Sequence, residues 1–152
     1  MNKKQINILL ADDDPDDCLF FEKALKEIAV KSHLTIVRDG EQLMNYLMEN
    51  TSGQGGTDII FLDLSMPRKT GFECLQEIKE NDRLKDIRVV MLSTSYPRDM
   101  IYEQGMIKTL KGIGAANFIR KPGDYSQIKD IIHNELKKLT EQKSLTKNEK
   151  DL

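Results

Sequence analysis

Acidic side chains, hydroxyls and one lysine follow four short apolar runs of the sequence. The runs are followed in turn by Asp12-Asp13-Asp14, by Asp63, by Ser93-Thr94-Ser95 and by Arg120-Lys121-Pro122. In an open parallel sheet, the carboxyl ends of the strands meet at one edge, where ligands bind. We therefore expect these side chains to converge on a single site.

Three aspartates of this set predict a magnesium site. Clustered carboxylates repel one another, and at least one keeps its proton unless a cation neutralises the group. Magnesium prefers carboxylates, water and phosphate oxygens as ligands. Asp12 and Asp13 are the expected metal pair, with Asp63 as a third ligand.

The same residues could support phosphoryl transfer. A carboxylate such as Asp63 can accept a phosphoryl group and become an aspartyl phosphate. Lys121 and the metal would neutralise the oxygens of the transferring group. Ser93 or Thr94 could then hydrogen-bond the new dianion, which would act as a switch on the surrounding surface.

Each of these residues also has a purely structural interpretation. The aspartates before Pro15 could cap a helix and favour its positive end. Asp63 could be a turn residue before Met66-Pro67, and Lys121 an ordinary solvated lysine. The combined pattern favours function, because four separate strand ends each supply a residue type that this chemistry needs.

Five apolar runs alternate with stretches of helical periodicity, and this alternation predicts a doubly wound α/β fold with a parallel sheet. Right-handed crossovers would place helices on both faces of the sheet. The predicted strands are Ile6–Ala11, Leu34–Val37, Asp58–Leu62, Ile87–Leu92 and Asn117–Ile119.

Two later segments are less regular. Pro97–Gly114 predicts a helix that is interrupted near Gly105. The polar segment 140–152 predicts a disordered tail, so the ordered domain is expected to span residues 1–139.

The composition limits the classes of function. The chain has 152 residues and a formal net charge of −2, which gives no bulk electrostatic case for nucleic acid or membrane binding. Its two cysteines, Cys18 and Cys74, do not form a disulfide framework. No apolar run is long enough for a signal peptide or a membrane span, so we expect a cytoplasmic protein.

The assembled motifs resemble the receiver domains of two-component response regulators. They are Ile8-Leu9-Leu10-Ala11-Asp12-Asp13-Asp14, Phe61-Leu62-Asp63-Leu64-Ser65-Met66-Pro67, Met91-Leu92-Ser93-Thr94 and Arg120-Lys121-Pro122. The resemblance covers roughly residues 7–139. It is closest in character to the stand-alone receivers that include the cyanobacterial phytochrome-associated regulators.

The resemblance implies a flavodoxin-like sheet of five parallel strands in the order 2-1-3-4-5. It also implies roles for single residues: Asp63 as phosphoacceptor, Asp12 and Asp13 as the acidic metal pair with Asp14 as a helix cap, Ser65 as a metal ligand through its backbone carbonyl, Ser93 as the switch hydroxyl with Thr94 as the small residue beside it, and Lys121 as the conserved-type lysine. Phe118 matches the aromatic switch position, and the Lys121–Pro122 bond would be cis.

The implied function is that of a single-domain response regulator, which receives a phosphoryl group in the presence of magnesium from a histidine kinase or phosphotransfer protein. Such a protein is not an enzyme on external substrates, since it catalyses only its own phosphorylation and dephosphorylation. Its output would be contact with an unknown downstream protein through Pro97–Gly114, the last strand and the last helix, a face that is also a candidate for homodimerisation.

Three alternatives remain to be weighed against this function. A phosphatase of the haloacid-dehalogenase type needs a second acid where this chain has Ser65. A flavodoxin-like cofactor binder needs a phosphate loop where Asp12-Asp13-Asp14 would repel one. A degenerate receiver that works as a phosphorylation-independent adaptor stays open, because Ser93 and Lys121 are separated by a long segment.

Overall fold

The computed structural model describes residues 5–50, 56–93, 100–122 and 124–150. The elements alternate along the chain as strand and helix from β1 to α5. The strands are β1 (Ile6–Ala11), β2 (Ser32–Val37), β3 (Ile59–Asp63), β4 (Arg88–Ser93) and β5 (Asn117–Arg120). The helices are α1 (Pro15–Lys26), α2 (Gly40–Glu49), α3 (Gly71–Glu80), α4 (Met100–Ile113) and α5 (Tyr125–Lys150).

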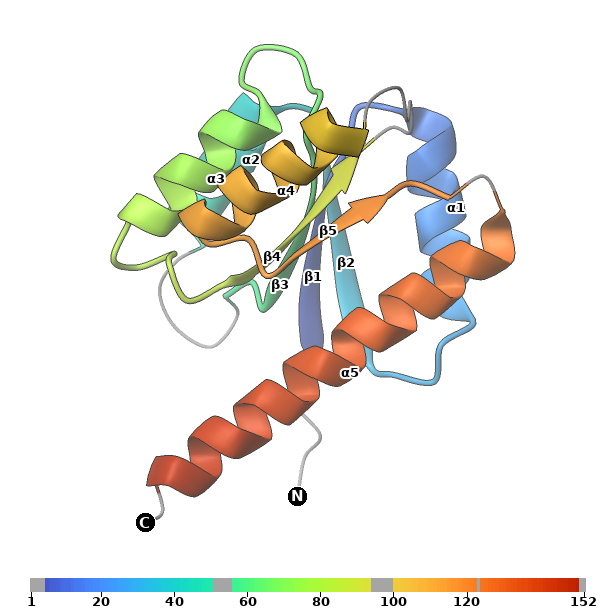
Figure 1. Ribbon diagram of the computed structural model, residues 1–152. Coiled ribbons are helices and arrows are strands. Elements are labelled where there is room, and N and C mark those ends of the chain that lie inside the picture. The colour runs from blue at the N-terminus through green and yellow to red at the C-terminus, as the bar shows by residue number, and fades with distance from the viewer. Residues whose placement is uncertain (1–4, 51–55, 94–99, 123, 151–152) are drawn as a thin grey trace.

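The strands form one parallel sheet in the order β2-β1-β3-β4-β5, which confirms the predicted fold class and strand order. Helices α1 and α5 lie on one face of the sheet, and α2, α3 and α4 lie on the other (Figure 1). The central strand β3 is buried along its whole length, as its continuous apolar run predicts.

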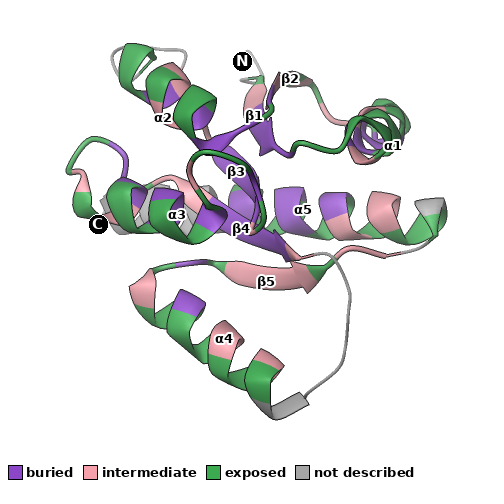
Figure 2. Cartoon of the chain, turned by 90° about the horizontal axis from the view of Figure 1, so that it is seen from above, coloured by how far each residue is buried: buried purple, intermediate pink, exposed green. Residues whose placement is uncertain are grey.

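Alternating side chains of the strands supply a separate core on each face. On one face, Phe61 of β3 meets Phe21 of α1 edge to face, with ring centroids 5.0 Å apart. On the other face, Leu62 and Met91 pack among the buried residues of α2, α3 and α4. Figure 2 shows this burial concentrated in the central strands β1, β3 and β4 and on the inner sides of the helices. The two cores fix the strand ends that carry the acidic residues.

Helix α4 is continuous from Met100 to Ile113, so the expected interruption near Gly105 is wrong. An exposed glycine lowers helix stability by only about 1 kcal/mol relative to alanine. The buried side chain of Leu110 anchors the same helix to the core, which offsets such a loss.

Helix α5 continues to Lys150, whereas we expected disorder from residue 140 onward. The polar composition suggested a tail, but residues 140–150 contain no glycine or proline and are rich in helix-forming lysine and glutamate. Extending an existing helix also needs no new nucleation. The boundary of the receiver domain at residue 139 stays a prediction.

Candidate functional site

The carboxyl edge of the sheet brings the sequence-predicted residues together. Asp12 follows β1 and its N–H donates to Val37 O at 3.0 Å, while Asp63 is the last residue of β3. Lys121 follows β5, and its N–H donates to Ser93 O at 2.8 Å. These backbone bonds extend the strand ladders into the loops and so fix the side chains that leave them.

Three carboxylates converge at this edge. Oxygens of Asp12, Asp13 and Asp63 all lie within 4.8 Å of one another. Asp12 and Asp63 are buried, with 1% and 2% of their surface exposed, whereas Asp13 is open to solvent. Hard oxygen ligands with one open side suit a divalent cation that keeps part of its water shell. The donor set therefore fits magnesium.

Asp14 does not join this cluster. Its carboxylate accepts hydrogen bonds from the N–H groups of Asp16 and Asp17 at 2.9 and 3.3 Å, and it is the N-cap of α1. This confirms the expected role of Asp14 as the cap of that helix, whereas the metal-binding roles of Asp12 and Asp13 stay a prediction.

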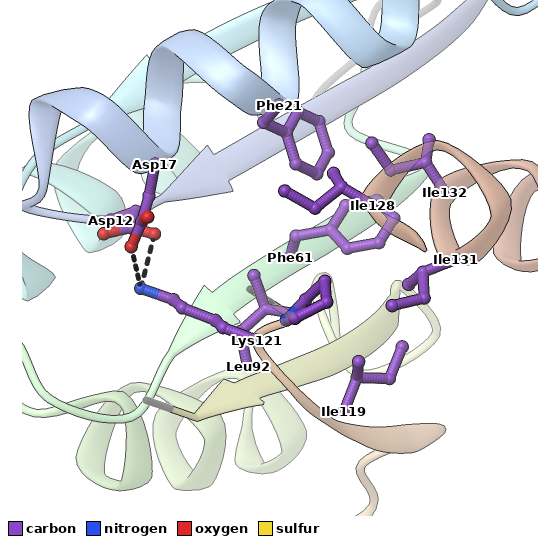
Figure 3. Close-up of a pocket in the computed structure, with 11 residues that line it drawn as sticks. Asp12, Asp17, Phe21, Phe61, Leu92, Ile119, Lys121, Ile128, Ile131 and Ile132 are labelled. Atoms are coloured by element: carbon purple, nitrogen blue, oxygen red, sulfur yellow. Dashed lines mark hydrogen bonds and ion pairs between the residues drawn. The ribbon is translucent and has the colours of Figure 1, made fainter. Parts of the chain in front are cut away.

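The ammonium of Lys121 bridges the carboxylates. Its Nζ lies 2.8 Å from Oδ2 of Asp12, 2.9 Å from Oδ2 of Asp17 and 3.0 Å from Oδ2 of Asp63. Figure 3 shows Lys121 reaching from the end of β5 toward Asp12 and Asp17. Lysine and acids that are 58 to 109 residues apart in the sequence thus form one cluster.

Burial and pairing act in opposite directions on these groups. Burial raises the pKa of Asp12 to about 6, although hydrogen bonds from Lys121 and from the N–H of Asp14 partly offset it. Burial alone would lower the pKa of Lys121, but its hydrogen bonds to Asp12 and Asp17 outweigh burial and raise that pKa above its usual value. Lys121 therefore stays positively charged, and burial makes the charged form of Asp12 costly unless a cation faces it.

An apolar cavity of about 50 Å³ lies beside the cluster. Figure 3 shows its wall of aromatic and aliphatic side chains from α1, the sheet and α5, with Asp12, Asp17 and Lys121 on one side. The wall is formed by Phe21, Phe61, Leu92, Ile119, Ile128, Ile131 and Ile132. Because these apolar side chains carry no charge, the ammonium of Lys121 is stabilised by the carboxylates on its other side.

The remaining predicted residues are less completely placed. The N–H of Ser65 donates to Oδ1 of Asp63 at 3.1 Å, and the role of its carbonyl as a metal ligand stays a prediction. Ser93 ends β4 and is half-buried, while Thr94 lies outside the described residues. Phe118 is half-buried and packs against the core beneath α4. No peptide bond of the described chain is cis, so Lys121–Pro122 adopts the intrinsically preferred trans form, contrary to expectation.

Asp17 is the site residue that the sequence did not single out. It lies in the first turn of α1, where an acidic residue is expected merely to favour the positive end of the helix. Only the packing of α1 against the sheet reveals its contact with Lys121. Nothing in the sequence around Asp17 marks this contact, because acidic residues are common in the first turn of a helix.

Comparisons with known proteins identify the class that this fold and site define. Residues 8–133 match the family model of the response regulator receiver domain, and the chain belongs to that family. In the part of the chain that the structure describes, no helix combines the length and apolar character needed to cross a bilayer.

Two of the curated relatives are named as response regulators. Response regulator Rcp1 of Synechocystis is 38% identical over 94 residues, which is 60% of this chain and 64% of the relative. Two-component response regulator ARR15 of Arabidopsis thaliana is 34% identical over 137 residues, which is 84% of this chain and 63% of the relative. The chain thus spans less than two thirds of the length of each.

Solved structures of related proteins share the whole fold. The manganese-bound form of response regulator Rcp1 superposes with a TM-score of 0.71 at 28% identity and covers 85% of this chain and 90% of that one. The phosphorylated cyanobacterial phytochrome response regulator RcpA gives a TM-score of 0.68 at 33% identity, covering 84% and 89%. This chain is therefore a receiver domain of a two-component system, similar to phytochrome-associated regulators.

Proposed function

We propose that this chain accepts a phosphoryl group on Asp63 in a magnesium-dependent reaction and signals by protein–protein contact. The observation that carries the proposal is the position of the Asp63 carboxylate, within 4.8 Å of the Asp12 and Asp13 carboxylates and 3.0 Å from the Lys121 ammonium. A phosphorylated relative and a manganese-bound relative of the same fold support it.

Asp12, Asp13 and Asp63, with the Ser65 carbonyl, would hold magnesium. The bound cation would neutralise the acidic cluster and the oxygens of the incoming phosphoryl group. An oxygen of Asp63 forms the new bond to phosphorus as the bond to the donor nitrogen breaks, and the donor imidazole keeps its electron pair. Lys121 offers N–H groups to the phosphoryl oxygens, where negative charge collects.

Ser93 is the proposed sensor of the phosphoryl group. It ends β4 and directly follows Leu92, the residue that pairs with Asp63 at the end of β3. A hydroxyl that turns toward a new dianion gains a charge-assisted hydrogen bond. Thr94 is assigned the neighbouring small-residue position by its place in the sequence alone.

A histidine kinase or phosphotransfer protein is the proposed donor. Helix α1 follows the acidic cluster directly and exposes Leu19 and Phe20, which keep 47% and 43% of their surface accessible. Exposed apolar side chains beside the acceptor suit a donor that must bring its phosphohistidine within bonding distance of Asp63.

Mass spectrometry of the intact protein after incubation with acetyl phosphate tests the proposal. We expect one phosphoryl adduct that requires magnesium, is absent from Asp63→Asn and is lost on treatment with hydroxylamine. Asp16→Asn removes an exposed carboxylate nearby and should leave the adduct in place. If a folded wild-type protein forms no adduct, the adaptor function takes the place of this one.

A further inference from the structure

Lys121 forms ion pairs with three carboxylates, and these differ in whether they also belong to the group that could bind a metal ion. An ammonium has three N–H donors, and the contacts at 2.8, 2.9 and 3.0 Å use all of them. Two of the acceptors, Asp12 and Asp63, also belong to the converging group that fits a cation. The third acceptor, Asp17, is outside that group.

A cation and Lys121 would therefore compete for the carboxylates of Asp12 and Asp63. Asp12 and Asp63 would hold the cation through their carboxylates, and a phosphoryl group on Asp63 would accept hydrogen bonds from N–H groups of Lys121. Asp17 has no part in either demand. It stands on α1, a different element from the two strand ends, and its side chain is 35% exposed.

The surroundings of Lys121 leave it few other partners. The side chain is 14% exposed and lies against the apolar cavity of Phe21, Leu92 and Ile119. A charge in this position is costly unless a counter-charge faces it. Without Asp17, the counter-charges left to the ammonium among the residues that the structure describes would be Asp12 and Asp63, which the cation needs.

Building on the function proposed above, we infer that Asp17 is a positioning residue for Lys121. Its carboxylate forms an ion pair with the Lys121 ammonium that does not involve the metal ligands. Asp12 and Asp63 can then bind the cation while Lys121 stays beside Asp63. Two of its N–H groups then remain for phosphoryl oxygens.

The test is the affinity for magnesium measured by calorimetry, a quantity that does not depend on phosphorylation. Asp17→Asn should weaken binding by about three- to fivefold, the size expected for a partly exposed ion pair, because Lys121 then competes more strongly for Asp12 and Asp63. Asp16→Asn removes an equal charge one residue away, where no ion pair with a described residue exists, and should change the affinity by less than about twofold.

A Lys121→Met background separates positioning from a general effect of charge. In that background the Lys121 ammonium no longer competes for Asp12 and Asp63. Adding Asp17→Asn should therefore lower the magnesium affinity no more than adding Asp16→Asn does. Asp17→Glu, which keeps the charge, should recover part of the lost affinity. If the asparagine variant does not give a folded circular dichroism spectrum, Asp17→Ser takes its place with the same expected result.

Two outcomes would overturn the inference: equal affinities for Asp17→Asn and Asp16→Asn, or an Asp17→Asn effect that persists in full without Lys121. Either result, in a wild-type protein that forms the Asp63 adduct, rejects the role of Asp17 and leaves the proposed function intact. The expected coupling in a protein that forms no adduct would instead reject phosphorylation and keep the Asp17–Lys121 anchor.

Discussion

At the scale of single residues, the place of Asp63 depends on a glycine that follows it by eight positions. Gly71 begins α3, and its N–H donates to Leu64 O at 3.0 Å. A Cβ at this position would lie 2.2 Å from the backbone oxygen of Asp63 and 2.9 Å from its carbonyl carbon. The turn after the acceptor can close this tightly only because no side chain intervenes.

Gly71→Ala should therefore push the turn away from Asp63. We expect the free energy of unfolding, measured by urea denaturation, to fall by about 1–3 kcal/mol. The matched control is Gly105→Ala in α4, where an added Cβ meets no atom within 4 Å beyond its own helical turn. That variant should be more stable by up to about 1 kcal/mol, since alanine favours helix. Equal effects of the two variants would contradict the steric argument.

At the scale of elements, a buried ion pair holds α5 against the edge of the sheet opposite the site. Glu135 is 2% exposed and lies 3.0 Å from Nη2 of Arg88 at the start of β4. Its second oxygen accepts from Nδ2 of Asn117 at 2.9 Å, at the start of β5. Burial alone would raise the pKa of Glu135, but the hydrogen bonds from Asn117 and Arg88 outweigh it and lower that pKa below its ordinary value of 4.5.

Glu135→Gln should lower the free energy of unfolding by about 1.5–3 kcal/mol at pH 7, because hydrogen bonds to a charged group lose their ionic part. The folded-state pKa is depressed, so the stabilisation is present above pH 4.5 and is lost as the pH falls through the folded value. The difference in free energy of unfolding between wild type and variant should accordingly become smaller as the pH falls. Thermal unfolding of both proteins between pH 3 and pH 7 measures this difference.

Glu141→Gln is the control for this prediction. Glu141 lies exposed on the same helix, and its replacement should change stability by less than about 0.5 kcal/mol. If the difference in free energy of unfolding between wild type and Glu135→Gln does not vary with pH, the charge of Glu135 does not contribute to stability.

At the scale of the whole molecule, the acidic site lies where a change at Asp63 can reach one side of the sheet. Ser93 ends β4, and β4 pairs with β5. Phe118 of β5 packs against the same core cluster as Met106 and Ile113 of α4. Figure 1 places α4 and β5 next to each other at the far end of the sheet from β2. This arrangement supports the expected signalling face, which consists of Pro97–Gly114, β5 and α5. Residues 97–99 of that face lie outside the described residues.

Amide hydrogen exchange should therefore change on α4, β5 and the start of α5 when a phosphoryl mimic such as beryllofluoride binds with magnesium. Peptides from β2 and α2 serve as an internal reference and should change little, and Asp63→Asn should show no response. Sedimentation of the same samples tests homodimerisation through this face. Unchanged exchange together with an unchanged sedimentation coefficient would exclude the proposed output.

Local patterns in the amino-acid sequence determine much of this protein. The continuous apolar runs predict the strands, and their regular alternation with helices predicts the parallel sheet. Because parallel strands all end at one edge, the same patterns also predict that Asp12, Asp63 and Lys121 meet. The strands, the helices and the shared edge of the sheet are predictable because they depend on the hydrophobic periodicity of neighbouring residues.

Only the tertiary structure decided the long-range contacts of side chains that lie on helices. Asp17 and Lys121 are separated by 104 residues, and Glu135 and Arg88 by 47, and nothing in their neighbourhoods marks either pair. The packing of α1 and α5 on the sheet sets both contacts. The continuity of α4 and the length of α5 were likewise decided by helix propagation and core packing, which outweighed a local glycine and a polar composition.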